Sequence, residues 1–363
     1  MSGGTYDERA ALWRRVERLE AERAELIAAL KECHEAMAYM SAELFTLGHV
    51  SSSMDLMKFI KQFDTEEKCI AYLVAKRWPH GPVCDKCGTV GHAFKLGDLR
   101  KWRCNSCGAD FSITAGTPME RTHLPLTTWF AAIWLIGTSS KGVSSMVVSR
   151  QLGISYKTAW FMSHRIRQLL TEGNDTLKGV VEVDETYIGG KRKRDQTSKR
   201  DNDDDQPKGR GGSRKMMAVA AVERDGRARC RKGRTHSERT IATAVFEWLD
   251  RSSIIVTDEL PAYRWIGRKF PAHLRVNHSK GEWSRRDPLA VACAHTNTVE
   301  SFNATIKRAI IGVWHWFSIK HADRYLREIA LRWNMRKMSR MERFDHILGT
   351  MAGNKLDWKG LTA

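Results

Sequence analysis

The chain has 363 residues, enough for two or three domains with hydrophobic cores. Its 60 Lys and Arg outnumber its 42 Asp and Glu, and the net charge of +18 predicts a polyanionic partner. Nucleic acid is the favoured partner, and an anionic membrane surface is the alternative. No apolar run is long enough to span a bilayer, and the charged N-terminus is unlike a secretory signal. Four of the eight cysteines are clustered and four are scattered, which favours a reducing cytoplasm over a disulfide framework.

Residues 1–50 are predicted to form a coiled-coil-like helix. Apolar side chains recur there at alternating steps of four and three, and Arg23 and Cys33 fill two gaps in the seam. The apolar positions are Leu12, Val16, Leu19, Leu26, Leu30, Met37, Met40 and Leu44. The pattern predicts a homo-oligomer, at least a dimer, but an amphipathic helix packed on its own chain would show the same pattern. A third interpretation is that the natural start is Met54, where a new unit begins.

Residues 54–118 are expected to hold a helical lead-in, which ends at Trp78 and Pro79, and a zinc ribbon. Two Cys-x-x-Cys pairs, separated by sixteen residues, consist of Cys84, Cys87, Cys104 and Cys107. Gly88 and Gly108 follow the pairs and let backbone amides approach the sulfurs. Four thiolates leave no open position on a tetrahedral zinc, so we expect one structural Zn²⁺ that supplies much of the folding free energy of this module. Redox chemistry at one pair would not explain two pairs. The remaining nearby candidates, which we expect on the surface, are His80 and His92.

Residues 119–175 are predicted to contain a helix-turn-helix DNA-binding region. Ser144 should cap a short helix, Gly153 should lie in the turn, and Ser155 should cap a second helix. The polar residues of that second helix are Tyr156, Lys157, Thr158, His164, Arg165 and Arg167, and those that suit a core are Ala159, Trp160, Met162 and Ile166. Its N-terminal end could enter a major groove, and the candidate DNA contacts are Tyr156, Lys157 and Arg165. A plain helical hairpin is the alternative.

From residue 176 to 345 the pattern changes to mixed strands and helices, which predicts an α/β catalytic domain. In the strand "VVEVDETYIGG", Glu182 and Asp184 face one way while two valines face the other. The apolar run "SSIIVTDEL" ends in Asp258, and Glu300 opens a later helix. Two strands and a helix fit between the two aspartates, and this order lets the first and fourth strands lie side by side, which would bring their acids together.

Three carboxylates held close together repel one another unless cations lie between them. Two hard cations bound by Asp184, Asp258 and Glu300 would neutralise the three groups and support in-line phosphoryl transfer. Taken alone, Asp258 would be a turn or cap residue, and Glu300 would be a first-turn acid favoured by the helix dipole. The neighbouring acids, which we expect to support the site or to lie on the surface, are Glu182, Glu185 and Glu259.

Two basic segments are further candidates for DNA contact. Residues 189–215 contain ten basic residues and five acids and are predicted to be a flexible loop that either grips DNA or is merely solvated. Lys307 lies two helical turns after Glu300 on the same face, and Arg308 follows it. Both are candidate DNA contacts, with the larger effect expected for Lys307. Residues 346–363 are expected to be a C-terminal tail.

The order and wording of several segments over residues 54–340 resemble the bacterial insertion-sequence transposases with an Asp-Asp-Glu active site, in the ISXO-like group (insertion-sequence family fifteen ninety-five). The segments are "RWPHGPVCDKCG", "TAGTPMERTHLPLTTWFAAIWL", "QLGISYKTAWFMSHRIR", "VEVDETYIGGKRK", "VTDELPAY", "VNHSKGEW" and "HTNTVESFNATIKRAIIGVWHWFSIKHADRYLREIALRWNMR". The resemblance implies a ribonuclease-H-like fold, two Mg²⁺ or Mn²⁺ ions, and catalysis by Asp184, Asp258 and Glu300. It also implies that Lys307 contacts transposon-end DNA and that Asn297 is a conceivable auxiliary metal ligand. The coiled coil at 1–50 departs from the pattern.

We therefore expect a transposase that cleaves DNA at insertion-sequence ends and joins the 3′-OH ends to target DNA, in the bacterial cytoplasm at the nucleoid. Two alternatives stay open at this point. One is a zinc-ribbon and helix-turn-helix DNA-binding protein without catalysis, and the other is a nuclease that hydrolyses DNA but never joins it. Strand transfer of a pre-cut end would separate a transposase from both.

Overall fold

The computed structural model describes residues 54–97, 100–170, 173, 175–189, 215–233, 238–286 and 293–362. The predicted coiled coil at 1–50 and the interior of the predicted basic loop at 189–215 lie outside the described residues. The elements below all belong to one compact unit, Leu56–Ala363. No helix among the described residues is long and apolar enough to cross a membrane.

A three-stranded antiparallel sheet forms the cysteine-rich module. Its strands, in the order β1-β2-β3, are Ala93–Lys95, Lys101–Cys104 and Asp110–Ser112. Trp102 and Phe111 are buried where they meet the ring of Trp78, with which Trp102 makes an edge-to-face contact at 5.2 Å between centroids. Gly88 and Gly108 have positive φ values of 74° and 68°, which residues other than glycine rarely adopt, and this explains the glycine after each cysteine pair.

The helical region is built from both ends of the described sequence. Helices α2 (Leu56–Gln62), α3 (Glu66–Arg77), α4 (Leu126–Thr138) and α11 (Arg340–Gly349) share one aromatic core. In that core Phe344 of α11 contacts the rings of Phe59, Phe63, Tyr72, Phe130 and Trp134. The predicted boundary of a C-terminal tail at residue 346 is wrong, because it cuts through α11. The short helix α12 (Trp358–Thr362) then buries Leu361.

Helices α5 (Ser145–Leu152) and α6 (Tyr156–Leu169) form the predicted helix pair. The side chain of Ser144 accepts from the amide of Val147, Gly153 is left-handed with φ 64°, and the side chain of Ser155 accepts from the amide of Thr158. These two caps and the turn are confirmed. The cause is local, since each serine oxygen satisfies an amide that has no partner within its helix.

The polar face predicted for α6 is wrong at three positions. His164 is completely buried, and Arg165 and Arg167 are 8% and 2% exposed. Helices α4 and α10 (Ala322–Asn334) contact α6 and cover this face. The basic groups are accommodated by partners from distant parts of the chain: the guanidinium of Arg167 donates to Glu328 and lies over the ring of Tyr325.

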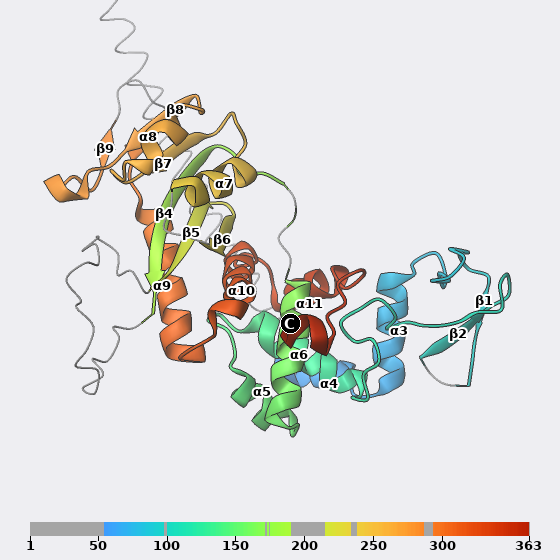
Figure 1. The fold of residues 1–363 in the computed structure, drawn as a ribbon. Helices are drawn as coiled ribbons and strands as arrows, with labels where there is room; N and C mark the ends of the chain where they lie inside the picture. Colours follow the sequence, from blue (N-terminus) through green and yellow to red (C-terminus); the bar gives the residue numbers. More distant parts are fainter. Residues whose placement is uncertain are drawn as a thin grey trace, which may run out of the picture. The chain divides into compact units, whose positions relative to one another are not determined.

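A five-stranded mixed sheet carries the predicted acids (Figure 1). Its strands are β4 (Val180–Ile188), β5 (Met216–Glu223), β6 (Ala228–Lys232), β7 (Ile254–Thr257) and β8 (Ala272–Arg275). Their order is β6-β5-β4-β7-β8, in which β4 pairs antiparallel with β5 and parallel with β7. The two intervening strands, the helix α7 (Glu238–Trp248) and the adjacency of the first and fourth strands are all confirmed.

Both faces of this sheet are covered by helices. Val181 and Val183 join a core with α7 and α8 (Ala262–Gly267), as the valine face of β4 predicted. Alternate residues of β5, such as Ala218 and Ala220, join the opposite core with α9 (Asn297–Ala309) and α10. A π-helical turn, Ile310–Trp314, continues α9. A short antiparallel pair, β9 (Arg285–Arg286) and β10 (Cys293–Ala294), lies between β8 and α9 in the sequence.

Candidate active site

The parallel pairing of β4 and β7 determines where two of the predicted acids lie. Glu182 of β4 is opposite Val256 of β7 in the register. Asp184 follows Glu182 by two residues, and Asp258 follows Val256 by two residues. Both acids therefore stand at the same end of neighbouring strands. Glu300 comes from the first turn of α9, the helix that packs across β4 and β5. Three segments far apart in the sequence thus bring the predicted acids to one end of the sheet.

The electrostatics of Asp184 and Asp258 reflect this proximity. Burial, followed by the charges of Asp258 and Glu300, raises the pKa of Asp184 to about 6, against the opposing effect of a hydrogen bond from Asn303. Burial also raises the pKa of Asp258, against a hydrogen bond from the amide of Leu260 at 3.0 Å. Removal from water disfavours both ionised carboxylates, and repulsion from the other two acids adds to this effect at Asp184. A bound cation would relieve both effects.

Glu182 lies on the same face of β4 as Asp184, but its role is structural. Its side chain is fully buried and accepts from the amides of Thr298 and Val299, at 2.8 and 3.0 Å, in the first turn of α9. It therefore caps the N-terminus of α9 from another part of the chain, because Thr296, at the N-cap, makes no side-chain cap hydrogen bond. Arg224 donates to Glu182 at 2.8 Å and balances its charge. With its oxygens engaged in this way, Glu182 supports the position of Glu300 rather than offering a free carboxylate.

Two residues that the sequence analysis did not single out lie against the predicted acids. Asn303 is one helical turn after Glu300, and its Nδ2 donates to Asp184 Oδ2 at 2.8 Å. His278 Nε2 lies 3.3 Å from Glu300 Oε1 and 3.1 Å from Thr296 Oγ1. The three-residue spacing from Glu300 could have identified Asn303, since residues i and i+3 share a helix face. No comparable signal existed for His278, which reaches the site from a separate 3₁₀ turn, His278–Lys280.

Glu185 lies on the opposite face of β4 from Asp184. The hydroxyl of the buried Tyr263 donates to its carboxylate. Burial and the charges of Asp184 and Asp258 together raise the pKa of Glu185 to about 8, although the hydrogen bond from Tyr263 lowers it. Glu185 is half-buried, and through this hydrogen bond it links β4 to Tyr263 of α8. Glu259 accepts a hydrogen bond from Ser279 and stays at the exposed rim.

The three acids fit hard divalent cations by their chemistry, since carboxylate oxygens are the ligands that Mg²⁺ and Mn²⁺ prefer. Glu300 keeps its side chain 46% exposed, so ligand oxygens face solvent at the sheet end. Among the described residues, however, the three acids do not bring their oxygens within 4.8 Å of one another. The group of potential metal ligands that meets this distance is the set of four cysteines. Asn297 begins α9 beside this end of the sheet, and its role as a ligand stays a prediction.

The four predicted cysteines converge in a geometry suited to zinc. All four sulfurs lie within 4.8 Å of one another, with Cys84 and Cys107 at 3.7 Å and Cys87 and Cys104 at 3.6 Å. A tetrahedral Zn²⁺ with Zn–S distances of about 2.3 Å has ligand-to-ligand edges of about 3.8 Å, which these pairs approach. Hydrogen bonds, of which that with the Thr89 hydroxyl at 3.2 Å has the largest effect, lower the pKa of the Cys87 thiol to about 6 and so favour the thiolate. His80 is exposed, and the exposed His92 contacts Ser106.

The predicted DNA contacts fall into two groups. Tyr156, Lys157, Lys307 and Arg308 are exposed, at the start of α6 and near the end of α9. Arg165 is not: its guanidinium donates to the carbonyl of Glu120 and lies over the rings of Trp129 and Phe161. The expectation of an exposed Arg165 is wrong, because the helical core covers that part of α6.

Comparisons with known proteins identify the family. Residues 176–334 match the model of the ISXO2-like transposase domain, and residues 64–110 match that of the transposase zinc-ribbon domain. The chain belongs to this family of insertion-sequence transposases. It is also 26% identical over 282 residues to an uncharacterized protein in transposable element ISH50 of Halobacterium salinarum, an alignment that covers 75% of this chain and 92% of that protein. No solved structure matches the chain. The transposase domain contains the mixed sheet and the three acids, and the zinc-ribbon match contains the four cysteines.

Proposed function

We propose that this protein catalyses metal-dependent cleavage of DNA at the ends of an insertion sequence and joins the resulting 3′-OH ends to target DNA, in a ribonuclease-H-like domain. The observation that carries the proposal is the placement of Asp184, Asp258 and Glu300 at one end of the mixed sheet, within the segment that matches the transposase domain. Family membership makes a DNA-cleaving enzyme the expectation, and the net charge of +18 suits a DNA substrate.

In this proposal Asp184, Asp258 and Glu300 would hold two divalent cations. When bound, such cations activate a water or a DNA 3′-OH and stabilise the leaving oxygen of phosphoryl transfer. The protein contributes position: Asn303 orients Asp184, and Glu182 fixes the first turn of α9, from which Glu300 projects. His278 and the hydroxyl of Thr296, which donates to Glu300 Oε1 at 2.8 Å, hold the third carboxylate.

The decisive test exchanges each acid for its neutral counterpart. Asp184→Asn, Asp258→Asn and Glu300→Gln each remove a charge with little change in volume, so each should abolish cleavage and joining while DNA binding persists. The assay is strand transfer of a pre-cut element end into plasmid DNA with Mg²⁺. Near-normal activity in any one variant would remove that residue from the site.

The same assay separates the alternatives. A nuclease would release cut DNA and give no joined product, and a DNA-binding protein without catalysis would give neither. The exposed start of α6 and the exposed Lys307 and Arg308 are the proposed DNA contacts.

A further inference from the structure

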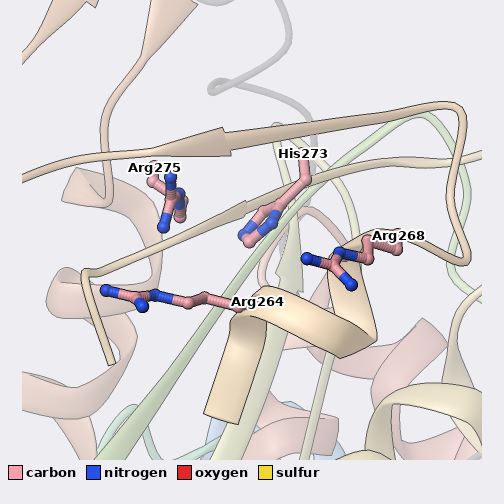
Figure 2. Close-up of a pocket in the computed structure, with 5 residues that line it drawn as sticks. Arg264, Arg268, His273 and Arg275 are labelled. Carbon is pink, nitrogen blue, oxygen red and sulfur yellow. The ribbon is translucent and has the colours of Figure 1, made fainter. Parts of the chain in front are cut away.

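Four nitrogen-bearing side chains surround one cavity at the edge of the catalytic sheet, away from the three acids themselves. The cavity measures about 420 Å³ and is lined by Arg264, Gly267, Arg268, His273 and Arg275. Figure 2 shows the side chains reaching into the same space, with Arg264 and Arg268 coming from α8 and its end, and His273 and Arg275 from β8. We call these four side chains the arginine cluster.

The sequence builds this cluster by two regular spacings. Arg264 and Arg268 are four residues apart, and Arg268 keeps helical backbone angles after α8, so both lie on nearly one helix face. His273 and Arg275 are two residues apart on β8 and therefore share one face of the strand. Gly267 lets the helix approach the strand, because a Cβ at that position would lie only 1.9 Å from Nδ1 of His273.

No acid in the described part of the chain forms an ion pair with the guanidinium groups of the cluster, those of Arg264, Arg268 and Arg275, although nearby Arg285 pairs with Glu282. Burial and, to a smaller extent, the charge of Arg275 lower the pKa of His273 to about 4, so the imidazole stays neutral. Its Nε2 lies 2.9 Å from Thr257 Oγ1. Three like charges around one cavity repel one another, and an anion between them would reverse that cost.

The cluster continues toward the proposed active site. A second cavity of about 320 Å³ shares Arg264 and Arg275 and adds Lys280 and Arg285. It also contains two acids, but Glu282 pairs with Arg285 at 3.4 Å and Glu259 accepts from Ser279 at 2.6 Å. Arg275 is opposite Thr257 in the β7–β8 register, and Thr257 immediately precedes Asp258 in the sequence. Basic groups therefore run from the outer edge of the sheet to the neighbourhood of Asp258.

We propose that the arginine cluster binds the backbone phosphates of the DNA strand that passes Asp258. The proposal rests on the proposed function, which supplies DNA as the substrate. Guanidinium groups bind phosphate oxygens in pairs of parallel hydrogen bonds, and several of them around one cavity suit consecutive phosphates. Contacts of this kind position DNA without reading bases, so the site should accept any sequence.

The test compares two neighbouring residues of like charge. Arg268 lines the cavity, whereas Lys269 is exposed and does not line it. The full chain carrying Asp184→Asn, to prevent cleavage, is titrated with a duplex of arbitrary sequence across a salt series. Arg268→Gln and Arg275→Gln should each lower the slope of log K against log salt by about one unit and raise the Kd up to about tenfold at 0.1 M salt. Lys269→Gln should leave the slope unchanged.

A conservative variant separates charge from structure. Arg268→Lys keeps the positive charge and should keep the salt slope, whereas a merely structural arginine would give equal losses with Lys and with Gln. Unchanged slopes in both Gln variants, or an equal loss in Lys269→Gln, would overturn the proposal. If the Gln variants leave the salt slope unchanged while the protein that keeps Asp184 cleaves and joins DNA, the phosphate-binding role of the arginine cluster is rejected and the proposed function stands. If the salt slopes fall but the protein that keeps Asp184 never cleaves DNA, the phosphate-binding role of the arginine cluster stands and the proposed function is rejected.

Discussion

The buried carboxylate of Glu182 couples the sheet to the helix that carries Glu300. It accepts two amides of α9 and an arginine donor, and it has no exposed surface. Its removal leaves those donors without their partner, which costs more than the hydrogen bonds themselves contribute. The arrangement makes one residue responsible both for stability and for the position of a proposed metal ligand.

We therefore expect Glu182→Gln to lower the free energy of unfolding by about 1–3 kcal/mol and to reduce cleavage even at temperatures where the variant is folded. Urea unfolding and the cleavage assay measure the two effects. Glu223→Gln is the matched control, because Glu223 is also a hydrogen-bonded acid of this sheet, at 14% side-chain exposure, but contacts Arg227 and the amide of Lys178 rather than α9. Full activity in folded Glu182→Gln would refute the positioning role.

At the same scale, Lys307 and Arg308 are neighbouring residues that test the proposed DNA contact of α9. Both are exposed, and Arg308 donates to Thr305 on its own helix. Since Lys307 lies two turns after Glu300, Lys307→Ala should weaken binding of terminal-repeat DNA and lower the salt slope by about one unit. Arg308→Ala should do less. Equal losses, or no loss for Lys307, would contradict the assigned face.

Between elements, α6 and α10 are joined by a fully buried ion pair. Arg167 Nε lies 2.6 Å from Glu328 Oε2, both side chains are inaccessible, and Arg332 also donates to Glu328. Burial alone would raise the pKa of Glu328, but the charges of Arg167 and Arg332 and their hydrogen bonds hold it below its ordinary value. The ionised carboxylate is therefore the form that stabilises the fold.

This pair gives an acid-sensitive contribution to stability. Because the pKa of Glu328 is lower in the folded chain than in the unfolded one, the contribution is complete above the ordinary glutamate pKa and is lost as the pH falls through the folded value. We expect Glu328→Gln to cost about 3–5 kcal/mol at neutral pH, since it leaves Arg167 buried without its counter-charge. Urea unfolding at several pH values measures this. The difference between wild type and variant should shrink as the pH falls, and a difference independent of pH would exclude Glu328 as its source.

The helices and strands show which features of the structure can be predicted from sequence patterns. The alternation in β4, the two serine caps and the end of β7 at Asp258 depend on neighbours along the chain, and all were predictable. The burial of Arg167 was not, because its partner Glu328 is 161 residues away. Glu182 escaped prediction for the same reason: the amides that it caps lie 116 and 117 residues further on. Spacing rules describe one element, whereas these roles arise only when two elements meet.

On the scale of the whole chain, the cysteine module depends on a metal more than on a core. Its three strands have ten residues in all, and the buried ones among them are Trp102, Cys104 and Phe111. Binding free energy at the four thiolates must therefore supply much of its folding free energy.

We expect one Zn²⁺ per chain by elemental measurement, lost on Cys104→Ser and kept on Cys293→Ser, whose sulfur lies outside the cluster. Chelation should unfold this module and impair end recognition or assembly rather than the chemical step, because four protein ligands leave no position for substrate. Protein purified without chelators that holds no zinc would contradict the assignment. Full DNA recognition after complete removal of zinc would contradict its structural role.

The aromatic core around Phe344 has a consequence for biosynthesis. Phe59, Phe130 and Trp134 leave the ribosome well before α11, which completes their packing only after the whole five-stranded sheet has been translated. Until then the early helices expose a large aromatic surface, a condition that favours chaperone binding and aggregation. A nascent chain that ends between α10 and α11 contains all five strands of the sheet and the helices α9 and α10, but it lacks the last wall of the helical region. The aromatic core is thus completed late in synthesis, when Phe344 packs against Phe59, a residue translated almost three hundred residues earlier.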